Sequence, residues 1–223
     1  MNLYSKLSAL GAVIVLSTAF ASADTATLLS NSSTVKYAGY DPVIHDVNNA
    51  QPGLNAGTFN IGTGGIWTAP VGGSSWVSFD PNSGPGGGFV DPNGTYTYFS
   101  SFTMAAGDNN FTGSLTVMAD DTTNVWLNGH ELLPDGAIGG DAKCSDNTPN
   151  CITPFTFDLA AGGWLQAGIN TLAFNVEQTG LASQGLDYAG TVTGSSVPEP
   201  STLLLLGTGV MGSAGALFRR MRA

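Results

Sequence analysis

The chain has 223 residues and a formal net charge of −10, and its charges are unevenly distributed. Residues 24–196 hold 15 of the 16 acidic residues, but of the six basic residues they hold Lys36 and Lys143 alone, an acidic excess of 13. A surface of this sign repels phosphate backbones and anionic lipids, which argues against nucleic acid as a partner. Because 42% of the residues are hydrophobic, this body can bury a core, unlike an acidic disordered tail.

Residues 1–23 have the pattern of a secretory signal peptide. Lys6 precedes an apolar stretch over residues 7–20, and Ala21 and Ala23 place small side chains where a signal peptidase requires them. We therefore expect signal peptidase to cleave before Asp24. The alternative, a first transmembrane helix, is less favoured because the apolar stretch is short and ends in a cleavage pattern.

Residues 201–218 form an uncharged, mainly apolar run of 18 residues near the C-terminus. As a helix this run would be roughly 27 Å long, close to the roughly 30 Å of a bilayer core, so we predict a transmembrane helix. Arg219, Arg220 and Arg222 follow it, and arginines next to a membrane span favour the cytoplasmic side. Both ends of the chain therefore predict that residues 24–196 fold outside the cytoplasm.

The tripeptide Pro198, Glu199 and Pro200 stands directly before this apolar run. Residues 197–223 thus resemble the PEP-CTERM sorting signal of Gram-negative bacteria, which an exosortase recognises. The resemblance implies an inner-membrane-anchored precursor that is cut near the tripeptide. It also implies a mature protein at the cell surface or in the extracellular matrix, often together with exopolysaccharide, and it implies nothing about the chemistry of the body.

The body is predicted to be all-β, because apolar side chains alternate with polar ones between turn residues. In residues 114–119, for example, Leu115, Val117 and Ala119 share one side. Asn128 and Gly129 suit the two positive φ angles of a type I′ hairpin turn. Further strands are expected over residues 58–61, 75–79, 95–102, 125–127, 130–133, 155–159, 172–176 and 186–193, and residues 120–123 are expected to form a turn. This pattern predicts a two-sheet antiparallel sandwich, most simply a jelly roll.

Residues 119–129, followed by residues 168–176, resemble the galactose-binding-like jelly rolls, a fold shared by many carbohydrate-binding modules. The run Tyr96-Thr97-Tyr98-Phe99, together with Phe102, fits the strand that usually precedes them. The resemblance consists of strand and turn patterns, so it implies a fold rather than a ligand.

Trp126 is the best candidate for a sugar contact, because alternation places it opposite its two core-facing neighbours. Proteins bind sugars with exposed aromatic faces and a few polar groups. We expect the polar groups from the adjacent residues Asn128, His130 and Glu131. The alternative is that Trp126 packs under a loop, Asn128 makes the turn and His130 is a solvated hairpin residue. The remaining tryptophans, Trp67, Trp76 and Trp164, are expected in core or loop packing.

Asp120 and Asp121 are candidate ligands of a structural Ca²⁺ ion, which prefers several oxygen ligands. Jelly-roll modules of the resembled kind often hold such an ion. A plain turn, in which a carboxylate accepts from its own backbone, is the alternative that the pattern favours.

Cys144 and Cys151 lie in a stretch with turn composition, in a chain predicted to leave the reducing cytoplasm. We expect a mutual disulfide, because no second cysteine pair accompanies them as it would in a metal site.

We expect a non-catalytic protein that binds exopolysaccharide through the sandwich. The sequence has no nucleophile elbow, zinc-binding helix motif or phosphate-binding glycine loop, and His45 and His130 are its two histidines. Two alternatives stay open. One is a structural coat component without a specific ligand, and the other, less favoured, is a glycoside hydrolase, which needs two suitably spaced carboxylates.

The sorting signal predicts that the mature protein lacks residues 203–223. Mass spectrometry of protein extracted from the cell surface should therefore detect peptides from the body and none from this C-terminal segment. Recovery of the segment on surface-extracted protein would contradict the prediction.

Overall fold

The computed structural model describes residues 23–43, 56–137, 144 and 147–196, and a few isolated positions near the C-terminus: 208, 209, 212, 219 and 220. Two compact units are distinguished, one formed by residues 22–197 and the other by residues 1–21 together with 198–223. The isolated C-terminal positions are helical. Most of the predicted signal peptide, the sorting tripeptide and most of residues 201–218 lie outside the described residues. Within the described part of the chain, no helix is long and apolar enough to cross a membrane.

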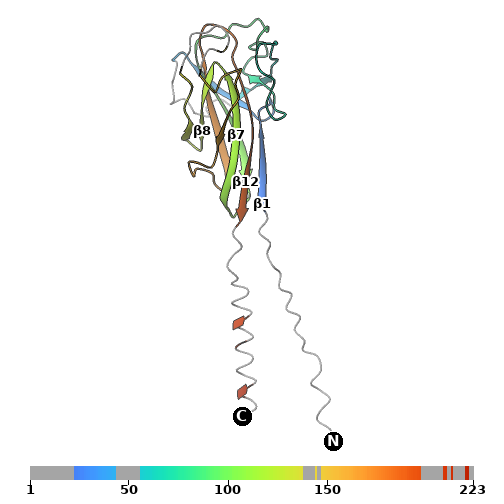
Figure 1. The fold of residues 1–223 in the computed structure, drawn as a ribbon, viewed down its shortest axis with the longest axis vertical. Helices are drawn as coiled ribbons and strands as arrows, with labels where there is room; N and C mark the ends of the chain where they lie inside the picture. The colour runs from blue at the N-terminus through green and yellow to red at the C-terminus, as the bar shows by residue number, and fades with distance from the viewer. Residues whose placement is uncertain are drawn as a thin grey trace. The chain divides into compact units, whose positions relative to one another are not determined.

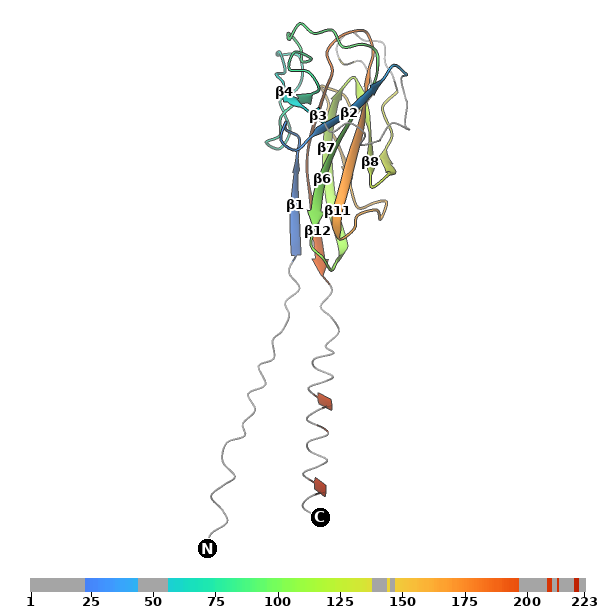
Figure 2. The same ribbon diagram turned by 180° about the vertical axis from the view of Figure 1, so that it is seen from behind.

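The larger unit contains two antiparallel sheets, which confirms the predicted all-β class (Figures 1 and 2). The first sheet has the order β10-β7-β12-β5-β4, with β1 pairing to β12, and the second has the order β3-β2-β6-β11-β8-β9. The strands of the first sheet are β1 (Ala23–Leu29), β4 (Phe59–Asn60), β5 (Val77–Ser78), β7 (Asp108–Asp120), β10 (Phe155–Asp158) and β12 (Gly185–Ser196). Those of the second are β2 (Lys36–Asp41), β3 (Ala56–Gly57), β6 (Gly94–Met104), β8 (Thr122–Leu127), β9 (His130–Leu133) and β11 (Gly168–Gln178).

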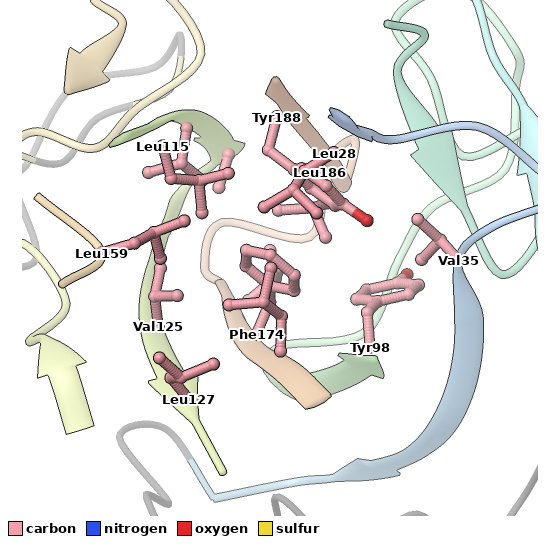
Figure 3. Close-up of a cluster of buried hydrophobic side chains, with 14 of the residues drawn as sticks. Leu28, Val35, Tyr98, Leu115, Val125, Leu127, Leu159, Phe174, Leu186 and Tyr188 are labelled. Atoms are coloured by element: carbon pink, nitrogen blue, oxygen red, sulfur yellow. The ribbon is translucent and has the colours of Figure 1, made fainter. Parts of the chain in front are cut away.

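Alternate side chains of the long strands point into a common core between the sheets (Figure 3). Leu115 of β7 comes from the first sheet, and Val125 and Leu127 of β8 come from the second; all three are fully buried. Phe174 of β11 stacks on Tyr188 of β12, with ring centroids 4.7 Å apart and planes 15° from parallel. The inward positions predicted from period-2 alternation are therefore core positions, and the residues between them form the outer faces of the sandwich.

The strands differ from the prediction in extent and number. Residues 120–123 are not a four-residue turn, because Thr122 and Thr123 already belong to β8 and are buried. Asp121 alone separates β7 from β8, and its N–H donates to the carbonyl oxygen of Glu177 at 2.7 Å. Strands β1, β2 and β3 were not predicted. In β1 the inward positions Ala26 and Leu28 are few and lie among exposed threonines, so its apolar alternation is weak.

The ends of the larger unit lie side by side. Ala23, the first residue of β1, is in register with Ser195 of β12, so the first and last strands meet at one end of the sandwich (Figures 1 and 2). The β7–β8 junction and the start of β12 lie together, since Gly185 is in register with Asp120.

A second buried cluster contains Trp67, Trp76 and Met118 together with the two cysteines. Cys144 and Cys151 form the predicted disulfide, with 5.6 Å between their Cα atoms. The two indoles are in contact, with ring centroids 4.4 Å apart, and both are almost completely buried. The packing expected for Trp67 and Trp76 is thus what the structure shows.

Candidate functional site

Trp126 lies on the outer face of the second sheet, because its neighbours along β8 face the core. It is half-buried, and its register partners are Ala173 on β11 and the exposed Glu131 on β9. The indole Nε1 is buried, yet it has no hydrogen-bond partner within the described part of the chain. A buried donor left unpaired costs about 1–3 kcal/mol, so an acceptor at this position would be stabilising.

Asn124 lies two residues before Trp126 on the same outer face and is fully buried. Its Oδ1 accepts from the backbone N–H of Asn175 at 3.3 Å and from the Nδ2 of Asn175 at 3.0 Å. Asn175 Oδ1 in turn accepts from the hydroxyl of Thr97 at 2.8 Å. The Nδ2 of Asn124 has no partner among the described residues. This face therefore holds two unfilled N–H donors on one strand, beside an indole and the carboxylate of Glu131.

Such a combination is suited to a neutral, oxygen-rich ligand. The indole provides an apolar face for C–H groups, its Nε1 provides a donor, and Glu131 provides an acceptor. Asn124 is fully buried, so its Nδ2 does not reach the surface.

Asn128 has a structural role in the hairpin turn. Its φ angle is +52° and that of Gly129 is +83°, as the predicted turn requires. Its Oδ1 accepts from the N–H of Thr171 at 2.9 Å, and its Nδ2 donates to the carbonyl oxygen of Trp164 at 2.8 Å and to Asn170 Oδ1 at 2.9 Å. The side chain of Asn128 is thus fully used in joining the turn to the start of β11.

His130 stacks on Trp164, with ring centroids 3.7 Å apart and planes 10° from parallel. Its register partner is Leu127, which faces the core, so His130 does not share the outer face with Trp126. Trp164 is 41% exposed, so of the two packing environments expected for it the structure shows the loop contact and not the core. The four predicted ligand residues therefore separate into Trp126 with Glu131 on one side, His130 with Trp164 on the other, and Asn128 in the turn between them.

Asp120 and Asp121 are both buried, and each has a partner. Asp120 Oδ2 accepts from Trp67 Nε1 at 2.7 Å, and Asp121 Oδ2 accepts from the N–H and the hydroxyl of Thr179, both at 2.6 Å. The two carboxylates are therefore held by different parts of the chain. Among the described residues, the one cluster of potential metal ligands is Asp120 with the sulfurs of the two cysteines, and those sulfurs are joined in the disulfide.

Asp91 is a buried acid in the loop before β6. Its Oδ1 accepts from the hydroxyl of Ser83 at 3.0 Å, whereas its Oδ2 is buried without a partner in the described chain. Burial is the main cause that raises the pKa of Asp91 to about 7; the hydroxyl of Ser83 opposes this rise and the nearby carboxylate of Asp80 adds to it. Nothing in the local sequence distinguishes this aspartate from a turn residue, because its burial depends on the packing of the loop around it.

Comparisons with known proteins identify the C-terminal segment. Residues 196–222 match the PEP-CTERM protein-sorting motif, which confirms the resemblance predicted from Pro198, Glu199 and Pro200. No curated protein matches the chain.

Several solved structures are similar to the chain. A family 35 carbohydrate binding module from Clostridium thermocellum is similar over 74% of this chain and 97% of that one, with 10% identity and a TM-score of 0.33. A family 35 carbohydrate binding module from an environmental isolate is similar over 77% of this chain and 99% of that one, with 12% identity and a TM-score of 0.33. A cycloisomaltooligosaccharide glucanotransferase from Paenibacillus sp., complexed with cycloisomaltoheptaose, is similar over 75% of this chain and 18% of that one. The identity is 12% and the TM-score is 0.32. Similarities this distant assign neither ligand nor function.

Asp91 predicts a fall in stability as the pH rises. Its pKa is about 7 in the folded protein and 3.8 in a solvated chain, so between about pH 4 and pH 7 the folded state binds more protons than the unfolded state. The free energy of unfolding should decrease over this window and stay low above it. Asp91→Asn removes the ionisable group, so its free energy of unfolding should not show this decrease. Measured by urea unfolding, it should exceed that of wild type by roughly 2–4 kcal/mol at pH 8 and differ little from it at pH 4.

The exposed aspartate Asp158 provides the control for this measurement. Asp158→Asn should follow the wild-type dependence on pH, because no burial penalty is removed. An equal difference between Asp91→Asn and wild type at pH 4 and pH 8 would refute the role given to Asp91.

Proposed function

We propose that this protein is an exported bacterial surface or matrix protein, processed by signal peptidase and an exosortase, that binds exopolysaccharide through its β-sandwich. The observation that carries the proposal is the PEP-CTERM protein-sorting motif at residues 196–222. This motif supports an exosortase substrate with a membrane-anchored precursor. We also propose the Gram-negative setting and the jelly-roll connectivity that the sequence predicts.

The charge distribution supports export of the body. The body has an acidic excess of 13, whereas three arginines stand at the extreme C-terminus. Arginines are retained on the cytoplasmic side of a membrane, and signal peptidase acts on the opposite side. Removal of the C-terminal segment then leaves a strongly acidic domain that anionic lipids repel, which favours its release to the surface or matrix.

The outer face around Trp126 supports binding of a glycan. Sugar hydroxyls are acceptors as well as donors, so they suit the unfilled N–H group of the half-buried Trp126. The exposed carboxylate of Glu131 is placed to accept from a sugar hydroxyl, since it is in register with Trp126. This recognition needs no reacting group, and we propose that the protein is not an enzyme.

Two substitutions of Trp126 test the proposed recognition. Mature protein extracted from the cell surface should bind exopolysaccharide from the same cells in isothermal titration calorimetry. Trp126→Ala removes both ring and donor and should weaken binding roughly ten-fold or more, whereas Trp126→Phe keeps an aromatic ring, loses the N–H and should weaken it roughly five-fold.

Trp164→Ala is the matched control, because Trp164 is a second partly exposed tryptophan on a different side of the hairpin. It should bind as wild type does. Unchanged binding by Trp126→Ala would remove Trp126 from the site, and a wild-type protein that binds no fraction of the polymer would favour a structural coat component.

A further inference from the structure

The outer face of the first sheet carries rows of hydroxyl side chains. Its inward positions, such as Leu115 and Val192, are core residues, so the positions between them face outward. Residues in register across β1, β12, β7 and β10 form three adjoining rows, namely Thr25, Thr193 and Thr112; Thr27, Thr191, Ser114 and Asp158; and Leu29, Ala189, Thr116 and Thr156. Neighbouring strands are about 4.8 Å apart and outward residues on one strand about 6.8 Å apart, so the hydroxyls form a regular array.

Most hydroxyls of the two outer rows are paired with each other, and Thr112 is the exception among the described residues. Thr25 and Thr193 hydrogen-bond to each other at 3.2 Å, and Thr116 and Thr156 do so at 2.8 Å. The hydroxyls of Thr27, Thr191 and Ser114 have no partner in the described part of the chain, and all three residues are exposed. The middle row is therefore free to donate to a ligand and to accept from it.

A hollow of about 320 Å³ lies over this middle row and the adjoining row of Leu29, Ala189 and Thr116. Thr27, Thr191 and Ser114 contribute the unpaired hydroxyls of its floor, and Val71 and Gly72 line it from a turn that packs on the sheet. Gly72 has a φ of +57°, and a Cβ added to it would come within 2.7 Å of the Cβ of Ala189. The absence of a side chain at this position is what lets the turn approach the sheet so closely.

A buried acid holds that turn in place. Asp187 of β12 is fully buried, and its Oδ2 accepts from the N–H of Val71 at 2.9 Å. Its Oδ1 accepts from the hydroxyls of Ser74 and Ser30, the latter at 2.9 Å. The wall of the hollow is thus fixed to the same strand that supplies Thr191, so the hollow is a built feature of the sheet.

The chemistry of this face indicates an uncharged, hydroxyl-rich ligand. The three rows contain no aromatic residue and one charged residue, the exposed Asp158 at the end of the middle row on the edge strand β10. The carboxylate of Asp158 and the acidic excess of the body both repel anionic polymers. Threonine and serine hydroxyls both donate and accept, as sugar hydroxyls do.

We propose that the hydroxyl face of the first sheet, centred on Thr27, Thr191 and Ser114, is a second glycan-binding site that takes a neutral polysaccharide chain. One sugar residue occupies the hollow under Val71 and Gly72. This inference rests on the proposed function, because it assumes that the protein binds exopolysaccharide. The face lies on the opposite side of the sandwich from Trp126, so one molecule joins two polymer chains.

The test compares a double variant, Thr27→Val with Thr191→Val, with wild-type mature protein. Valine has the shape and the β-branching of threonine without its hydroxyl, so the strands are retained. Exopolysaccharide is separated by anion exchange into a neutral and an acidic fraction, and calorimetry gives affinity and stoichiometry for each. For the neutral fraction we expect wild-type protein to show two binding sites per molecule. In the double variant the affinity of the hydroxyl face should fall roughly ten-fold, so that one site per molecule is measured.

Matched variants separate loss of hydroxyls from loss of structure. Thr103→Val removes the hydroxyl of another exposed threonine, on β6 of the second sheet, and should retain both sites. Thr27→Ser with Thr191→Ser keeps both hydroxyls and should also retain both sites. Wild-type protein should gel or precipitate the neutral fraction by cross-linking, and the double valine variant should not.

Several outcomes would overturn the inference. Wild-type protein that binds polymer, with unchanged stoichiometry and cross-linking in the double valine variant, would remove the hydroxyl face and leave the proposed function intact. Wild-type protein that binds neither fraction would refute the proposed function itself. Preference for the acidic fraction would overturn the neutral ligand. A dimer in sedimentation velocity that the valine pair abolishes would show that the face joins two copies instead.

Discussion

The contact between Phe174 and Tyr188 joins the two sheets at the centre of the core. Phe174 belongs to the second sheet and Tyr188 to the first, and their rings stack at 4.7 Å. The hydroxyl of Tyr188 donates within the core to Ser100 at 2.7 Å, so this large side chain is satisfied at both its apolar and its polar end. Because a shift of one residue in a strand would turn its core face outward, burial of these rings fixes the register of β11 and β12.

The same register determines what each outer face displays. On β8 it places Asn124 and Trp126 outward, and on β1 and β12 it places Thr27 and Thr191 outward. One outer face therefore combines an indole with buried amides, whereas the other is an array of hydroxyls. The two faces differ in chemistry although they enclose one core, and this difference is the basis for assigning them separate contacts with polymer.

Features that depend on a few consecutive residues were predictable from the sequence. Alternation is sufficient to orient Trp126, the Asn128-Gly129 pair to predict the hairpin turn, and the exported context of Cys144 and Cys151 to predict the disulfide. Features that depend on strand order were not. The hydroxyl rows exist because β1 pairs with β12, and β1 has too few inward apolar residues to be recognised as a strand.

Contacts between loops could not be predicted either, because they join segments that are far apart in the sequence. The stack of His130 on Trp164 brings together residues 34 positions apart, and neither residue stands in a pattern that indicates the other. The burial of Asp91 likewise depends on loop packing rather than on its neighbours in the chain. Sequence patterns therefore predicted which residues of the second sheet face outward, but they did not predict which side chains contact each other.

Strand β1 pairs with β12 alone among the described strands, so its other edge presents unpaired backbone N–H and C=O groups. Such an edge is a template for the strands of a neighbouring molecule, and Asp24 is the one charged residue of β1. The acidic excess of the body keeps neighbouring molecules apart over about one Debye length. Repulsion between acidic molecules thus opposes pairing of strands at the unpaired edge of β1. The ionic strength of the surroundings sets the distance over which this repulsion acts.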